Sequence, residues 1–248
     1  MIKTINDVIV RQNKIIASAK LHKARFGYFA ALYLEMTQTV KQHIEQGKFD
    51  DNARMEQLVV VFANRYFEAF DQWQARAKPS QSWQIALDET TKNNITVIQH
   101  LLCSINAHIN LDLGIAAAQI CPGNKIEGLK SDFERINNIL AYLLDDVQIK
   151  LGKISWPMRF LDKIGKNHDE QLANFSLGVA RKSAWLVALS LAKLPENQHP
   201  NFILSLDSKT SLLAKLIINP GMVANTLLKP VKLFEPTDPG KIINVLIS

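Results

Sequence analysis

Residues 104–120 read SINAHINLDLGIAAAQI and cover the second half of an apolar segment, about 90–119, that decides how the chain folds. On a helix, with about 100° between successive residues, the apolar side chains of this segment point in all directions, as Ile105, Leu111 and Leu113 illustrate. A helix that is apolar on every side has to be buried. The segment therefore predicts a central helix that other helices surround.

The rest of the chain shows the same helical periodicity and almost no strand signal. Further helices are expected over residues 3–21, 25–46, 52–77, 132–151, 168–194 and 200–218. Ser131 and Glu134 form a capping-box pattern at the start of the 132–151 segment. Only 10 Gly and 9 Pro interrupt the 248 residues, and no Asn-Gly or Asp-Gly turn joins two alternating runs.

These signals predict an all-α fold. We expect a single multi-helix, bundle-like domain over residues 1–248, built around the buried central helix, because no linker-like stretch marks a boundary. The tail, from about 220 to 248, contains Pro230, Pro236 and Pro239. Proline interrupts helices, so we expect this tail to be irregular, with short helical pieces packed on the bundle.

Composition and charge narrow the class of protein. Lys+Arg 29 exceed Asp+Glu 23, but the basic residues are scattered and do not alternate with aromatics, which argues against a nucleic-acid partner. No uninterrupted apolar stretch reaches the roughly 18 residues of a membrane span, and the N-terminus lacks the apolar core of a secretory signal. Cys103 and Cys121 are too few for a disulfide framework. We therefore expect a cytoplasmic protein without a membrane span.

Four polar residues interrupt the central helix: Asn106, His108, Asn110 and Asp112. Residues four apart stack on an α-helix, so His108 lies over Asp112 on one side. Asn106 and Asn110 form a second pair on nearly the opposite side. Because burying an unpaired polar group costs roughly 1–3 kcal/mol, and more for a charge, all four need partners on neighbouring helices.

Residues outside the central helix can supply these partners. Asp112 requires a cation, a proton or several donors, and the candidate cations are Arg65 and Arg181. The other expected partners are Tyr66, Asp132, Asn137 and Asn138. In one interpretation the cluster is purely structural: it fixes how the helices pack, adds little net stability, and is costly to break from one side.

The same cluster also fits a ligand-binding or catalytic site. A small polar or anionic ligand could be clamped there by arginine. The expected ligand-binding residues are Arg65, Tyr66, Asn106, Asn110, Asp132, Asn137 and Arg181. His108 and Asp112 are the expected catalytic residues, because a carboxylate orients a histidine ring and raises its basicity, as hydrolytic acid–base chemistry requires. This pair could alternatively hold a divalent metal ion, completed by Asp132, Glu68 or the His168-Asp169 pair.

Several longer strings point to a family. NAHINLDLGIAAA at 106–118, DFERINNIL at 132–140 and ARKSAW at 180–185 occur together with RYFEAF at 65–70 and SW at 82–83. Over roughly 60–195, this combination resembles the bacterial family known as domain of unknown function 5995. The resemblance implies an all-helical fold and no particular activity, substrate or cofactor. It picks out Arg65, Trp83, Asn106, His108, Asn110, Asp112, Asp132, Asn137 and Arg181.

Two kinds of function follow from these observations, and the sequence does not decide between enzyme and non-enzyme. The first is a small-molecule-binding protein or hydrolase-like enzyme, since titratable groups in apolar surroundings are typical of functional sites. The second is a non-catalytic helical scaffold or interaction module. It is supported by the lack of a nucleophile elbow, a phosphate-binding glycine loop and an HExxH motif. A cavity beside His108 favours the first, and a sealed, fully paired cluster favours the second.

Overall fold

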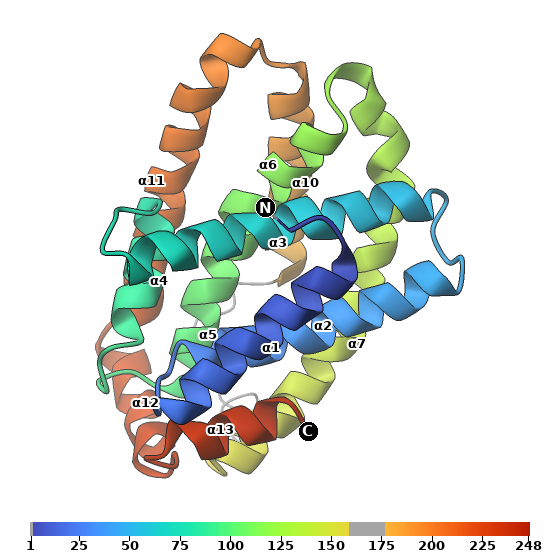
Figure 1. Ribbon diagram of the computed structural model, residues 1–248. Helices are drawn as coiled ribbons and strands as arrows, with labels where there is room; N and C mark the ends of the chain where they lie inside the picture. The colour runs from blue at the N-terminus through green and yellow to red at the C-terminus, as the bar shows by residue number, and fades with distance from the viewer. Residues whose placement is uncertain (1, 159–176) are drawn as a thin grey trace.

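Helices form all the regular structure in residues 2–158 and 177–248, the part of the chain that the computed structural model describes (Figure 1). The helices are α1 (Ile5–Leu21), α2 (Gly27–Glu45), α3 (Asn52–Gln74), α4 (Gln81–Glu89), α5 (Val97–Asn106), α6 (Gly114–Ile120), α7 (Lys130–Ile154), α10 (Leu177–Lys193), α11 (His199–Ile218), α12 (Met222–Leu233) and α13 (Pro239–Leu246). The π-helix η1 (Ala107–Leu113) and the 3-10 helices η2 (Gly123–Leu129) and η3 (Glu196–Gln198) complete the set. The predicted all-α fold class is confirmed.

The predicted central helix is present and consists of three consecutive helical segments. α5, η1 and α6 continue one another over Val97–Ile120, and this unit is surrounded by α2, α3, α4, α10 and α11. By length and composition it could cross a membrane, but 89% of its most apolar window is buried against other helices. In Figure 1 it runs between α1, α2 and α3 on the near side and α10 behind, with α11 along the left edge. Its apolar residues therefore form the centre of the core.

The central helix begins seven residues later than the sequence pattern predicts. Thr96 caps it: the Thr96 side chain accepts a hydrogen bond from the Gln99 backbone N–H, and the Gln99 side chain accepts one from the Thr96 backbone. The Glu235 carboxylate also accepts a hydrogen bond from the Val97 N–H, at 2.6 Å. These contacts satisfy backbone donors that a helix end leaves unpaired.

The start of α7 corrects a second expectation. Ser131 and Glu134 do not form a capping box, since α7 begins at Lys130 and η2 runs directly into it. Ser131 therefore lies in the first turn and not before it. The expected helix over 168–194 is observed from Leu177 to Lys193, and residues 168–176 lie outside the described part of the chain.

The C-terminal tail is more regular than the expected irregular segment. α12 accommodates Pro230 near its C-terminal end, and Pro239 occupies the first turn of α13, where a missing N–H leaves no bond unmade. α13 packs against α1, α2 and α7 and buries Ile242, Ile243 and Leu246. The prolines therefore lie at positions that a helix tolerates, near the end of α12 and in the first turn of α13.

Candidate functional site

The middle of the central helix departs from α-helical geometry at the polar residues. Ala107–Leu113 is a π-helix, in which each backbone N–H bonds the carbonyl five residues back. Short π-helical insertions inside α-helices occur frequently at functional sites, because they widen the helix locally and change where its side chains point. The segment contains His108, Asn110 and Asp112, and Asn106 immediately precedes it.

Asp112 is held by two donors from different helices. Arg65 of α3 donates from Nε at 2.8 Å, and Trp83 of α4 donates from Nε1 at 2.7 Å. The Asp112 side chain is 1% exposed, and that of Arg65 is 27% exposed. A buried carboxylate is tolerable when it has a cation and further donors, so this pairing supplies what Asp112 requires. Of the two candidate cations, Arg65 is the one that contacts it.

His108 lies against aromatic rings on one side and Asp112 on the other. Its ring stacks on Phe62, with 3.6 Å between centroids and 9° between planes, and meets Tyr33 edge-on at 4.6 Å. Its Nδ1 is 3.4 Å from Asp112 Oδ2, a long contact. Burial lowers the pKa of His108 more than the nearby Asp112 raises it. The imidazole is therefore neutral near pH 7, and a proton on Nδ1, facing the carboxylate, leaves Nε2 as a hydrogen-bond acceptor.

His108, to which this Nε2 atom belongs, lines a partly enclosed cavity of about 70 Å³. The cavity walls come from α2, α3, α5, η1, α7 and α10 and are mostly apolar, with Val40, Leu58 and Ile109 among them. Two buried polar atoms of its lining residues, His108 Nε2 and Tyr33 Oη, have no hydrogen-bond partner among the described residues. Burial raises the pKa of Tyr33, so its phenol stays protonated and can donate.

Arg181 also lines this cavity. It is 4% exposed, and burial lowers the pKa of its guanidinium to about 10, so it remains a cation at neutral pH. Two of the predicted site residues, His108 and Arg181, are thus brought to one cavity, although they come from η1 and α10. Asp112 and Arg65 do not line the cavity; Asp112 contacts His108, and Arg65 contacts Asp112.

The two asparagines form a separate contact on the far side of the central helix. Asn106 donates from Nδ2 to the carbonyl of Thr210 in α11 at 2.9 Å, and Asn110 donates to Asn106 Oδ1 at 2.8 Å. This agrees with the predicted second pair on nearly the opposite side from His108. Since both side chains are engaged with each other and with α11, they connect helices and do not face the cavity.

Tyr66 lies in the aromatic packing next to the site. Its ring contacts Trp83 at 5.2 Å and Phe29 at 5.1 Å, and it is 6.2 Å from the His108 ring. Its hydroxyl has no hydrogen-bond partner within the described chain, and Tyr66 lines a different, smaller space of about 10 Å³ beside His100. Tyr66 therefore supports the walls around His108 without lining the 70 Å³ cavity.

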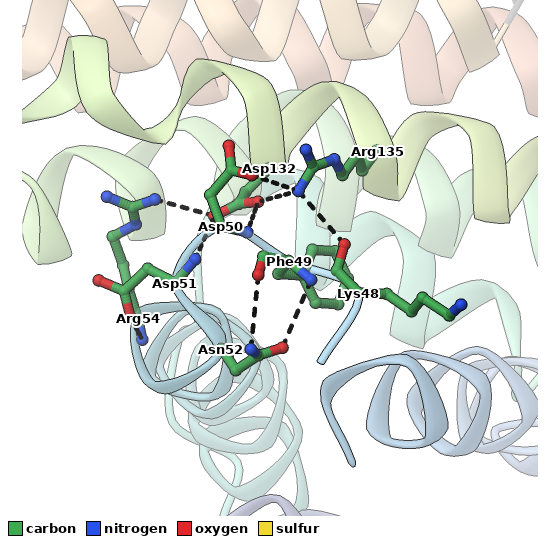
Figure 2. Close-up of polar contacts among 8 residues, drawn as sticks. All are labelled: Lys48, Phe49, Asp50, Asp51, Asn52, Arg54, Asp132 and Arg135. Carbon is green, nitrogen blue, oxygen red and sulfur yellow. Dashed lines mark hydrogen bonds and ion pairs between the residues drawn. The ribbon is translucent and has the colours of Figure 1, made fainter. Parts of the chain in front are cut away.

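Asp132 contacts none of the residues around His108 described above; its partners lie elsewhere in the fold. Figure 2 shows that it joins the turn between α2 and α3 to the first turn of α7. Its oxygens accept the backbone N–H groups of Asp50 and Asp51 at 2.7 and 3.1 Å, together with Arg54 at 2.8 Å and Arg135 at 3.3 Å. The Asp132 side chain is 0% exposed and both of its oxygens accept hydrogen bonds, so its role is to hold the α2–α3 turn against α7. The structure does not place Asp132 with His108, Arg65 or Arg181.

The described residues contain no set of ligands for the divalent metal ion that the sequence allowed: among them, no group of three or more His, Cys, Asp or Glu could hold one. Glu68, which the sequence offered as a third ligand, is exposed and accepts a hydrogen bond from Gln72. The side chain of Asn137 and the pair His168-Asp169 lie outside the described residues. Asp132 is engaged as above.

Sequence reasoning from residue types missed three contributors to the site. Tyr33 and Phe62 come from α2 and α3 and look like ordinary core positions in the sequence. Trp83 emerged only from the family resemblance, and its N–H could have been expected to need a partner because buried tryptophans usually find one.

The family comparison covers the whole candidate site. The chain belongs to the family described as a family of unknown function, DUF5995, whose model matches residues 5–220. No curated protein and no solved structure matches it. The resemblance is thus confirmed, and the match reaches from α1 to the end of α11. It includes every residue discussed at the cavity.

Proposed function

We propose that this DUF5995 protein binds a small organic molecule in the cavity beside η1, with His108 and Tyr33 holding the polar end of that molecule. One observation carries the proposal: two buried polar atoms lack partners among the described residues, and both belong to residues that line the same apolar cavity. An unmet buried hydrogen bond costs about 1–3 kcal/mol. A ligand that satisfies both atoms recovers that cost on binding.

The chemistry of the two atoms indicates a hydroxyl-bearing ligand. Neutral His108 offers an acceptor at Nε2, and the Tyr33 phenol can donate. A hydroxyl group both donates and accepts, so one ligand hydroxyl can satisfy both residues. Arg181 lines the same cavity and would favour a carboxylate instead, so alcohols and carboxylates are the two head groups to compare.

The size and lining of the cavity limit the part of the ligand that is buried. An apolar cavity of about 150 Å³ is known to admit benzene, and this one is about half that size. By this comparison, the buried part is about three non-hydrogen atoms, half of the six in benzene. Apolar walls favour a hydrocarbon body over water, since water needs two to four polar partners.

Binding is better supported than hydrolysis. The cavity lining in the described chain includes no serine, cysteine or carboxylate, and the Thr37 hydroxyl already donates to the Tyr33 carbonyl at 2.8 Å. The structural alternative accounts for the asparagine pair and for Asp132, whose polar atoms are engaged. It leaves His108 Nε2 and Tyr33 Oη unexplained.

The test measures binding of butan-1-ol and of 1-chlorobutane, which has a similar body without a hydroxyl, by chemical-shift changes in NMR spectra. The wild type should bind the alcohol about 2-fold to 12-fold more tightly, as one net hydrogen bond of about 0.5–1.5 kcal/mol predicts. His108→Phe keeps a ring against Phe62 and should abolish this preference. His100→Phe is the matched control, because His100 is also buried with both ring nitrogens lacking partners in the described chain, yet does not line the cavity. Butyrate tests the role of Arg181. If neither alcohol nor butyrate binds the folded wild type, the proposal is wrong.

A further inference from the structure

α11 and the start of α12 expose an unusual number of large apolar side chains. Leu204, Leu212, Leu216, Met222 and Val223 are between 55% and 87% exposed. We call Leu204, Leu212 and Leu216 of α11, together with Lys209 and Lys215, the α11 surface. The inner side of α11 packs on α4, α5 and η1, so the leucines on its outer side are not needed for the core.

The outer side of α11 has a symmetrical arrangement. At about 100° per residue, Lys209 and Lys215 lie about 60° to either side of Leu212. Leu212 is thus the centre of the exposed side, flanked by the two lysines. Such lysines can extend their charged ends away from an apolar surface while their stems cover it.

The charge of this region has one sign. Asp207 is the only acidic residue between positions 197 and 234. It is 5% exposed and turned inward, where it accepts hydrogen bonds from the Gln81 and Ser82 backbone N–H groups and from the Ser82 hydroxyl. Lys209 and Lys215 are exposed, so the α11 surface combines apolar side chains and cations without an exposed carboxylate from its own segment.

We propose that the α11 surface docks onto an anionic lipid bilayer. Helices that lie in the membrane interface present leucine and similar residues to the acyl chains and lysine to anionic head groups. The segments Glu196–Ile218 and Met222–Leu233 are together apolar enough for a membrane span but are bent by 63°. Because the inner face of α11 is held in the bundle, this surface can lie on a membrane without crossing it.

Charge complementarity distinguishes a lipid surface from a second copy of the chain. Two copies joined through this face would bring Lys209 and Lys215 towards the same residues of the other copy with no exposed carboxylate from α11 between them. Like charges in such an arrangement repel. Phosphatidylserine supplies the negative charges that a second copy lacks. This proposal does not depend on ligand binding in the cavity.

Sedimentation with lipid vesicles tests the proposal. The full chain should bind vesicles of phosphatidylcholine with phosphatidylserine and bind phosphatidylcholine alone much more weakly. Each lysine near an anionic surface contributes about a fivefold factor, so Lys209→Gln with Lys215→Gln should weaken binding about 25-fold. Leu212→Glu should weaken it at least tenfold. Leu21→Glu is the matched control, since Leu21 is 79% exposed on α1 and is not one of the residues of the α11 surface, so its replacement should leave binding unchanged.

Circular dichroism verifies that each variant is folded, and sedimentation equilibrium measures the oligomeric state without lipid. Equal loss of vesicle binding in the Leu21 and Leu212 variants would overturn the assignment to α11. Absence of binding to anionic vesicles by the folded wild type would overturn the proposal altogether. A dimer that Leu212→Glu dissociates, with no vesicle binding, would show that a second copy covers the surface instead.

Discussion

Replacing Asp112 by leucine should lower the free energy of unfolding by about 3–5 kcal/mol, because it breaks a buried ion pair from one side. Asp112 accepts hydrogen bonds from Arg65 Nε at 2.8 Å and Trp83 Nε1 at 2.7 Å. Trp83 is 1% exposed, so its N–H cannot turn to water and costs about 1–3 kcal/mol when unpaired. Arg65 is 27% exposed and recovers part of its hydration, which places the expected loss near the lower end, about 3 kcal/mol.

Urea unfolding followed by circular dichroism measures this loss, provided that the dependence on urea concentration stays unchanged. Asp112→Asn keeps one acceptor oxygen and should cost less than Asp112→Leu. A double-mutant cycle with Arg65→Leu isolates the pair: the doubly substituted protein should be more stable than the sum of the single losses predicts, by about 1 kcal/mol or more. A loss below about 0.5 kcal/mol for Asp112→Leu, within the range of surface substitutions, would refute the reasoning.

Three further predictions concern other buried positions. The pKa of His100 is lowered to about 3 by burial, and the pKa of His108 is also lowered, so below pH 6.5 the unfolded chain binds protons that the folded chain does not. Each histidine therefore reduces the free energy of unfolding by up to about 1.4 kcal/mol per pH unit as the pH falls, and His100→Phe should make the loss between pH 6.5 and pH 5 smaller by about 2 kcal/mol in urea titrations. Gly114→Ala should destabilise by about 1–3 kcal/mol, because an added Cβ would lie 2.7 Å from the Ala184 carbonyl oxygen. Gly128→Ala is the control, since a Cβ there would meet only the flexible Arg54 side chain at 3.6 Å, and equal melting temperatures of the two variants would contradict this. Asp132→Asn should cost about 1–3 kcal/mol through its bonds to arginine and backbone N–H groups, yet leave butan-1-ol binding unchanged; loss of binding in a folded variant would instead place Asp132 in the ligand site.

The sequence by itself determined the fold class and the position of the central helix. Both follow from periodicity, a property of neighbouring residues, and Val97–Ile120 is buried because apolar side chains occupy all of its sides. The same reasoning required a cation or donors for Asp112, since the cost of burying a carboxylate does not depend on the details of packing. It also separated the asparagine pair from the side of His108.

Only the tertiary structure decided which residues meet. Arg65, and not Arg181, contacts Asp112, and Asp132 binds a turn 81 and 82 residues away in the chain and not the central helix. Tyr33 and Phe62 reach His108 because α2 and α3 pack against the central helix, and the sequence pattern did not indicate the π-helical geometry around His108. Which side chains contact one another depends on how whole helices pack, and many residues determine the angle and position at which two helices cross. A local pattern can therefore state that a buried polar group needs a partner, while the packing of distant helices selects the partner.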